Sequence, residues 1–153
     1  MPGNTVVRMA ITRLENVGIV VEDLAAATSF FVELGLVVDG ESSVEGDWVD
    51  RVVGLEGVRT DIAVLRTSDG RPALELMHFN APSVRGGDRN APPNTLGIRR
   101  ISFAVDDLDA TVSGLLDRGT DLLGEVVNYQ DVYKLCCVRG PEGIIVMLFE
   151  AIG

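Results

Sequence analysis

The chain has 153 residues, of which 46% are hydrophobic and 24% charged, a composition that fits one globular domain and excludes an unfolded chain. There are 13 Lys and Arg residues against 23 Asp and Glu, which gives a formal net charge of -10. Such a field repels polyanions, so the sequence disfavours nucleic-acid binding and attachment to an anionic membrane.

Cysteine and histidine content restricts the chemistry further. Cys136 and Cys137 are adjacent, and neighbours in sequence rarely form a disulfide because one peptide unit holds their Cα atoms too close together. His78 is the single histidine, which excludes a zinc site built on two or three histidines of one chain. No apolar segment reaches the roughly 20 residues of a membrane span, and the N-terminus lacks a secretory signal, so we expect a soluble, cytoplasmic protein.

The first predicted elements are a strand and a helix. Apolar residues alternate over residues 16–21, which is typical of a strand with one buried face. Asp23 opens the amphipathic segment that follows and Gly35 closes it. We therefore expect these two residues as the N-cap and the C′ residue of a helix.

Three strands are predicted after this helix, near residues 36–43, 60–67 and 72–79. A Ser-Asp-Gly turn signal joins the last two of them. An irregular segment, residues 44–58, separates the first from the second. The spacing of Trp48, Val52 and Leu55 within that segment predicts a short helix.

The second half of the chain repeats the first. Residues 100–119 align without gaps to residues 16–35, at the offset of 84 residues that separates Val21 from Val105. Asp107 and Gly119 take the places of Asp23 and Gly35 and are expected as the matching helix caps. Three more strands are predicted near residues 123–127, 133–138 and 144–149, the last two joined by a Gly-Pro-Glu-Gly turn. Each half is therefore predicted to be βαβββ.

These patterns divide the chain into four parts. Residues 1–13 are an N-terminal extension, 14–79 a first βαβββ module, 80–95 a linker loop rich in Pro, Gly and Asn, and 96–153 a second module. We expect the two modules to form one domain.

Four motifs resemble a known family: ENVGIVVEDL, SDGRPALELM, GIRRISFAVDDLD and GPEGIIVMLFE. With the tandem βαβββ pattern they make the chain, from Leu14 to Glu150, similar to the vicinal oxygen chelate superfamily of glyoxalases, bleomycin-resistance proteins and extradiol dioxygenases. The resemblance implies an α+β fold in which the modules form a curved mixed sheet around a pocket. It also implies a divalent metal on the concave face and a homodimer.

The resemblance places the family's four metal ligands at Asn16, Glu75, Arg100 and Met147, and only Glu75 keeps the residue type. A guanidinium has no lone pair to donate and stays protonated, and a thioether is a poor ligand for hard cations. We therefore expect no metal and no other cofactor. In their place we expect a fixed positive charge on Arg100, with Glu75 as its bidentate counter-ion.

The period of two along strands groups these residues on one face of the predicted sheet. In a family-like cup one pocket would be lined by Asn16, Gly18, Val20, Ala73, Glu75, Met77, Arg100, Ser102, Ala104, Ile145, Met147 and Phe149. The alternate residues would pack under the helices, and His78 falls among them, away from Glu75. An apolar pocket with a few polar groups is the usual composition of a small-molecule site.

The candidate catalytic residues are Arg100, Glu75 and Asn16. The candidate substrate contacts are Met147, Trp48, Tyr129, Tyr133, Ser102 and Met77. Plainer alternatives stay open: Arg100 and Glu75 as a structural ion pair, and Trp48 as a dimer contact or a cover of the core. Cys136 and Cys137 are expected on opposite faces of a strand, packed in the core, with a reactive thiol as the alternative.

Three functions remain open. The first is a metal-independent isomerase, lyase or cyclase in which Arg100 stabilises an oxyanion, Glu75 moves a proton and Asn16 orients a substrate oxygen. A carboxylate paired with an arginine is a weak base, so substrate must break that pair or another group must move the proton. The second function is sequestration of a small molecule such as an antibiotic. The third is a metal-dependent lyase or dioxygenase that uses Glu75 and ligands outside the family positions.

Overall fold

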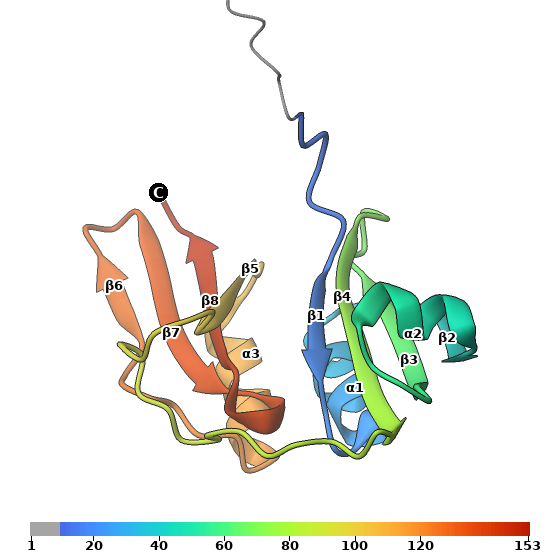
Figure 1. The fold of residues 1–153 in the computed structure, drawn as a ribbon. Coiled ribbons are helices and arrows are strands. Elements are labelled where there is room, and N and C mark those ends of the chain that lie inside the picture. The colour runs from blue at the N-terminus through green and yellow to red at the C-terminus, as the bar shows by residue number, and fades with distance from the viewer. Residues whose placement is uncertain (1–9) are drawn as a thin grey trace, which may run out of the picture.

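The computed structural model describes residues 10–153, so most of the predicted N-terminal extension lies outside the described residues. The first module contains β1 (Val17–Val20), α1 (Leu24–Glu33), β2 (Val37–Glu45), α2 (Asp47–Val53), β3 (Arg59–Arg66) and β4 (Pro72–Ala81). The second contains β5 (Arg100–Ala104), α3 (Leu108–Asp117), β6 (Val127–Tyr129), β7 (Tyr133–Arg139), the 3-10 turn η1 (Pro141–Gly143) and β8 (Ile145–Ala151). The predicted α+β fold of two βαβββ modules is confirmed (Figure 1). In residues 10–153 no helix has the length and hydropathy needed to cross a membrane.

Each module forms its own four-stranded mixed sheet. The strand orders are β1-β4-β3-β2 and β5-β8-β7-β6. β1 runs parallel to β4, and β5 runs parallel to β8, whereas the remaining neighbours are antiparallel. Among the described residues, β1 and β5 are therefore edge strands, each paired on one side.

The predicted helix caps are confirmed. The side chains of Asp23 and Asp107 each accept a hydrogen bond of 3.0 Å from the backbone N–H three residues later. Gly35 and Gly119 follow the helix ends with φ of 108° and 85°, which a residue with a side chain rarely adopts. The sequence repeat thus reproduces the same helix start and the same helix end in both modules.

The sixth strand was predicted in the wrong place. The expected range was 123–127, but β6 shares only Val127 with it, and Leu122 forms an isolated bridge to Val138 instead. Gly124 has no side chain to pack and weakens a strand at this point. The chain resumes pairing further on, because Gln130 and Asp131 adopt positive φ and turn β6 back onto β7.

The short helix predicted in residues 44–58 is α2, but its apolar spacing does not mark a buried face. Trp48 and Val52 are 60% and 76% exposed, and Val49 is the buried residue of the helix. The spacing therefore locates the helix correctly and leaves Trp48 on the surface of the first module.

Helix α1 packs against both sheets. It contacts β3 and β4 of its own sheet and also η1, which leads into β8 of the other. The fully buried ring of Phe31 meets Phe103 of β5 edge-on, with ring centroids 6.4 Å apart. Covered residues of both sheets belong to one core, among them Leu74, Leu76, Val146 and Leu148.

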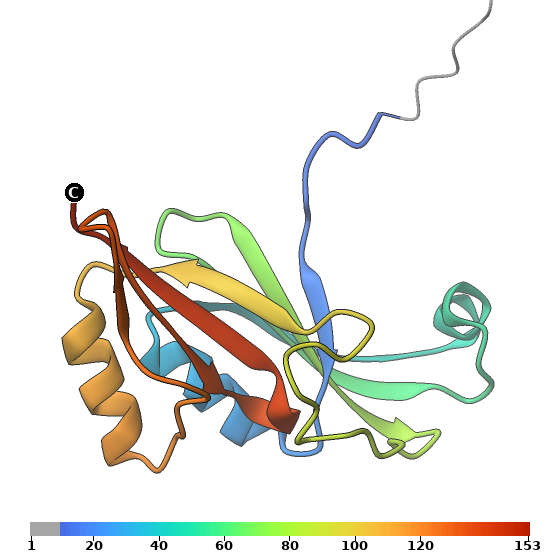
Figure 2. The same cartoon turned by 90° about the vertical axis from the view of Figure 1, so that its left-hand side faces the viewer.

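This packing sets the direction of the two sheets. They are separate layers in Figure 1, and in Figure 2 β8 passes in front of α1. Because a helix between two sheets contacts the inner face of each, their uncovered faces are turned away from each other. The residues expected to line a single pocket thus lie on two surfaces that face away from each other within one chain.

The linker between the modules (yellow-green in Figure 1) is fastened to both of them. Arg89 donates to the carboxylates of Glu22 and Glu142, at 2.6 and 2.9 Å, and the Glu22 N–H donates to Glu142. The hydrogen bond to Glu22 is the main cause that raises the pKa of Arg89 above its ordinary value. Gly143 lies beneath this contact, and a Cβ there would overlap the backbone carbonyl of Arg89.

Gly143→Ala is therefore expected to destabilise the protein. The residue has a φ of 78°, and the overlap with the Arg89 carbonyl adds to that strain. We predict a loss of about 2 kcal/mol or more in the free energy of unfolding, measured as a lower urea midpoint.

Gly114→Ala is the matched control, because Gly114 lies inside α3 with no atom near its Cβ position. Alanine should stabilise that helix by about 0.5–1 kcal/mol. An unchanged midpoint for Gly143→Ala would show that the linker does not pack on η1 as described.

Candidate functional site

Two of the predicted catalytic residues lie together on the uncovered face of the first sheet. The Asn16 side chain, just before β1, donates a hydrogen bond of 3.3 Å to the Glu75 carboxylate of β4, and both residues are half-buried. The parallel register places Gly18 beside Glu75. A Cβ at Gly18 would lie 3.0 Å from the end of the Met77 side chain, so Met77 covers this part of the strand.

The third predicted catalytic residue is on the other sheet. Arg100 opens β5 and is exposed, as is Ser102 on the same face. Within residues 10–153 the Arg100 side chain has no ion pair, and Glu75 bonds to Asn16 instead. The structure therefore does not bring Arg100 and Glu75 together within one chain, because the helix layer turns the two faces away from each other.

An apolar cavity of about 780 Å³ opens on the uncovered face of the second sheet. Its walls include Val127, Tyr129, Tyr133, Leu135, Met147 and Phe149. Tyr129 and Tyr133 are paired across the β6–β7 hairpin, and the Tyr133 ring meets Phe149 edge-on at 6.0 Å. Its volume and aromatic lining are those of a site for a small organic molecule.

The cavity contains only part of the predicted substrate-contact set. It brings together Tyr129, Tyr133 and Met147. Trp48 and Met77 belong to the first module, and Ser102 lies on β5 outside the cavity lining.

A smaller recess of about 230 Å³ adjoins the cavity and is lined by two arginines, Arg99 and Arg100. Pro93 of the linker and Cys137 line both spaces, so the recess and the cavity are neighbours. The Nε of Arg99 is buried and has no hydrogen-bond partner in the described part of the chain. Sequence reasoning missed Arg99, although two adjacent arginines in an acidic chain are a visible signal.

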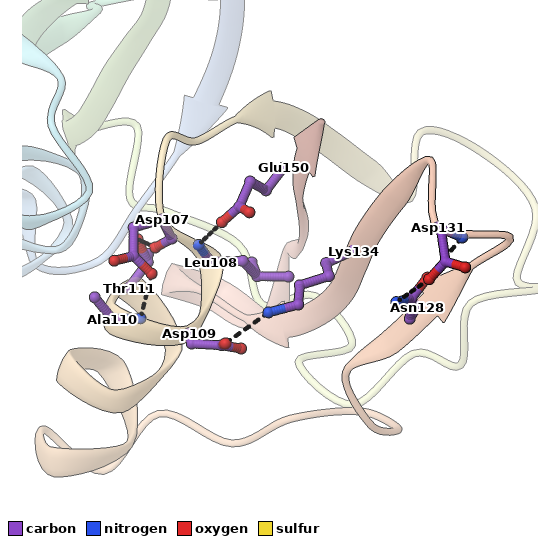
Figure 3. Close-up of polar contacts among 9 residues, drawn as sticks. All are labelled: Asp107, Leu108, Asp109, Ala110, Thr111, Asn128, Asp131, Lys134 and Glu150. Carbon is purple, nitrogen blue, oxygen red and sulfur yellow. Dashed lines mark hydrogen bonds and ion pairs between the residues drawn. The ribbon is translucent and has the colours of Figure 1, made fainter. Parts of the chain in front are cut away.

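Polar contacts on the covered side hold the cavity floor in place (Figure 3). Glu150 of β8 accepts a 2.7 Å hydrogen bond from the Leu108 N–H at the start of α3. Lys134 of β7 donates to Asp109 at 2.7 Å, and this bond is the main cause that raises the pKa of Lys134. Both strands are thus attached to α3 from behind, and the alternate residues are left facing the cavity.

The two cysteines lie on opposite faces of β7, as predicted. Cys136 pairs with Leu148 and is buried in the core, where desolvation raises the pKa of its thiol above the ordinary value. Cys137 pairs with Met147, is half-buried and lines the cavity. The thiolate is the reactive form, so Cys136 is poorly suited to react.

A thiol reagent should therefore distinguish the two residues. Brief treatment with N-ethylmaleimide is expected to modify Cys137 before Cys136, as read by mass spectrometry of peptides from Cys136→Ser and Cys137→Ser variants. Faster labelling of Cys136 would contradict the assignment of the β7 faces.

The residues at the family's ligand positions do not fit a divalent metal. An amide, one carboxylate, a guanidinium and a thioether offer a single strong ligand, and the guanidinium would repel a cation. In the part of the chain that the structure describes, no three His, Cys, Asp or Glu side chains are placed to hold a metal ion. His78 bonds through its Nδ1 to the Val21 carbonyl at 3.0 Å, a structural contact between β4 and the end of β1.

The fold agrees with comparison to known proteins. Residues 15–136 match the model of the Glyoxalase/Bleomycin resistance protein/Dioxygenase superfamily, and the chain belongs to this superfamily. The resemblance inferred from the motifs is confirmed.

Three relatives span nearly the whole chain. A glyoxalase family protein from Bacillus cereus is 44% identical with a TM-score of 0.91, over 96% of this chain and 99% of that one. The trypanothione-dependent glyoxalase I of Leishmania major shares the fold, with 18% identity and a TM-score of 0.65 over 90% of this chain and 86% of that one. The uncharacterized protein YaeR of Escherichia coli is 22% identical over 93% of this chain and 98% of its own length.

Proposed function

We propose that the protein is a metal-independent enzyme that acts on a small oxygenated organic molecule, at a site shared between two protomers. The observation that carries this proposal is the separation of the polar residues. Glu75 and Asn16 lie on one uncovered face and Arg100 on another that is turned away from it. A second copy can bring the first sheet of one protomer opposite the second sheet of its partner.

Unpaired edges and exposed apolar residues support a homodimer. In residues 10–153, β1 and β5 each leave one edge without a strand partner, and such edges tend to be covered. Val20 is 44% exposed beside one edge, and Ile98 is 75% exposed before the other. A two-fold axis would cover both edges at once, since the same contact is made twice.

The chemistry proposed for the shared site is proton transfer next to a carbonyl group. Glu75, oriented by the Asn16 amide, takes a proton from carbon, and the electron pair moves to the carbonyl oxygen. Arg100 of the partner stabilises the resulting enolate as a fixed positive charge. Return of the proton to another carbon gives an isomerisation, and loss of a group from the neighbouring carbon gives a lyase reaction.

The two charged residues cannot stay paired while Glu75 acts as a base. An arginine in contact favours the ionised carboxylate and makes it a weaker base. Substrate bound between the two faces would separate them and give Arg100 a new partner, the substrate oxygen. The proposed reaction therefore depends on the substrate displacing Glu75 from Arg100.

Complementation between inactive variants tests the shared site. Glu75→Gln and Arg100→Gln should each lower kcat/KM by about 10²–10⁴-fold. The assay is deuterium exchange from D2O next to the carbonyl in a panel of aryl-substituted ketones, read by proton NMR. After the two variants are mixed and exchange subunits, half of the dimers are mixed and each holds one intact site, so about a quarter of wild-type activity should return.

Mixing Glu75→Gln with an Asn16→Ala, Glu75→Gln double variant is the control, because both partners lack the carboxylate and no intact site forms. A mixture of the two single variants that stays inactive would contradict a site shared between protomers. Full activity of either single variant would contradict the role given to that residue.

Sequestration of a small molecule is the second candidate function. It is favoured by the aromatic walls of the cavity, where Tyr129 and Tyr133 are 55% and 42% exposed and can stack on a planar ligand. A ligand recovered unchanged from a stoichiometric complex, with no exchange activity in the panel, would support this function over catalysis.

A further inference from the structure

We infer that the second-sheet cavity takes an amphipathic anion, with an apolar body of aromatic size on the β6–β8 surface and a carboxylate or similar oxyanion at Arg100. This inference rests on the proposed function, since it assigns the cavity to the same site. It adds the class of molecule that is bound.

The apolar body is indicated by the shape and lining of the cavity. Its volume of about 780 Å³ lies in the range of small-molecule sites, and its walls include Leu, Val, Met and Phe side chains and two tyrosines. Val127 and Tyr129 are 45% and 55% exposed, so a bound molecule would remove apolar surface from water. A polar sugar or a free phosphate would gain little from such walls.

The anionic group is indicated by the arginines of the adjoining recess. Arg100 is exposed and has no carboxylate partner within the described chain, and Arg99 presents a buried Nε–H without an acceptor. Buried donors are normally hydrogen-bonded, and a guanidinium binds a planar oxyanion through two parallel bonds. Pro93 and Cys137 line both spaces, so one molecule can occupy the cavity and reach the recess.

The charge of the whole chain does not oppose this assignment. The net charge of -10 acts at long range and is screened over about 10 Å at 0.1 M salt, whereas the arginines act at contact. Glu125 is the one acidic residue of the cavity lining, and it is exposed on the segment before β6. Its removal should leave anion binding intact or strengthen it.

Two fluorescent dyes separate the contributions of the apolar body and of the anionic group to binding affinity. 1-Anilinonaphthalene-8-sulfonate and N-phenyl-1-naphthylamine share the aromatic body, and only the first carries a sulfonate. Wild-type protein should bind the sulfonate dye about tenfold more tightly, as expected for one charge-assisted contact. Arg100→Gln should remove most of that preference and leave the Kd of the neutral dye unchanged.

Matched variants identify where the dyes bind. Arg71→Gln removes the same charge from an exposed hairpin of the first sheet and should change neither Kd. Tyr129→Ser, at an exposed wall position, should weaken both dyes, and Glu125→Gln should weaken neither. Urea midpoints of the variants establish that each is folded.

The inference is overturned if neither dye binds, if Tyr129→Ser binds both dyes as tightly as wild type, or if the sulfonate gives no preference that depends on Arg100. These dyes undergo no reaction, so the result is independent of catalysis. If the sulfonate dye is preferred but the mixed variants stay inactive, the proposed shared catalytic site is contradicted and the inferred ligand class is supported. If activity returns on mixing but the sulfonate dye is not preferred, the shared catalytic site is supported and the inferred ligand class is contradicted.

Discussion

The packing of α1 between the two sheets is the constraint on which the rest of the molecule depends. Phe31 is fully buried and touches Phe103 of the other module, so one aromatic contact joins the two halves of the core. Ion pairs outside the core also link the two modules: Arg118 pairs with Glu33, and Arg89 of the linker pairs with Glu22. Since α1 occupies the space between the sheets, their uncovered faces are turned to the outside of the chain.

The residues at the family's ligand positions can be explained by one change, the replacement of a metal ion by the charge of a side chain. A metal would supply a positive charge that polarises a substrate oxygen, and Arg100 supplies a permanent charge of the same sign. Glu75 keeps the carboxylate, and Asn16 keeps a polar group that orients it at 3.3 Å. Met147 extends the apolar wall of the second-sheet cavity. The arrangement favours charge stabilisation by a side chain and an apolar binding surface beside it.

Local features of the fold could be predicted from sequence because each depends on neighbouring residues. The helix caps at Asp23 and Asp107, the glycines that end both helices and the opposite faces of Cys136 and Cys137 follow from short-range rules. The position of Arg100 relative to Glu75 could not be predicted, because it depends on how the two modules pack, and strand periodicity does not contain that information. The two-residue period of a strand predicts which residues share a face. The burial of Phe31 against Phe103 determines where that face points.

Chemical cross-linking tests most directly whether Glu75 meets Arg100 across a dimer. A carbodiimide joins a carboxylate to an amine in contact with it, so an Arg100→Lys variant places an amine at position 100. Lys134, the only native lysine, contacts Asp109 within the chain and serves as the internal control. When 15N-labelled and unlabelled protomers are mixed, the cross-link between Lys134 and Asp109 should join two labelled peptides or two unlabelled peptides. The account predicts 75–100 links that combine labelled and unlabelled peptides. Links of that pair within one chain only, or none at all, would contradict it.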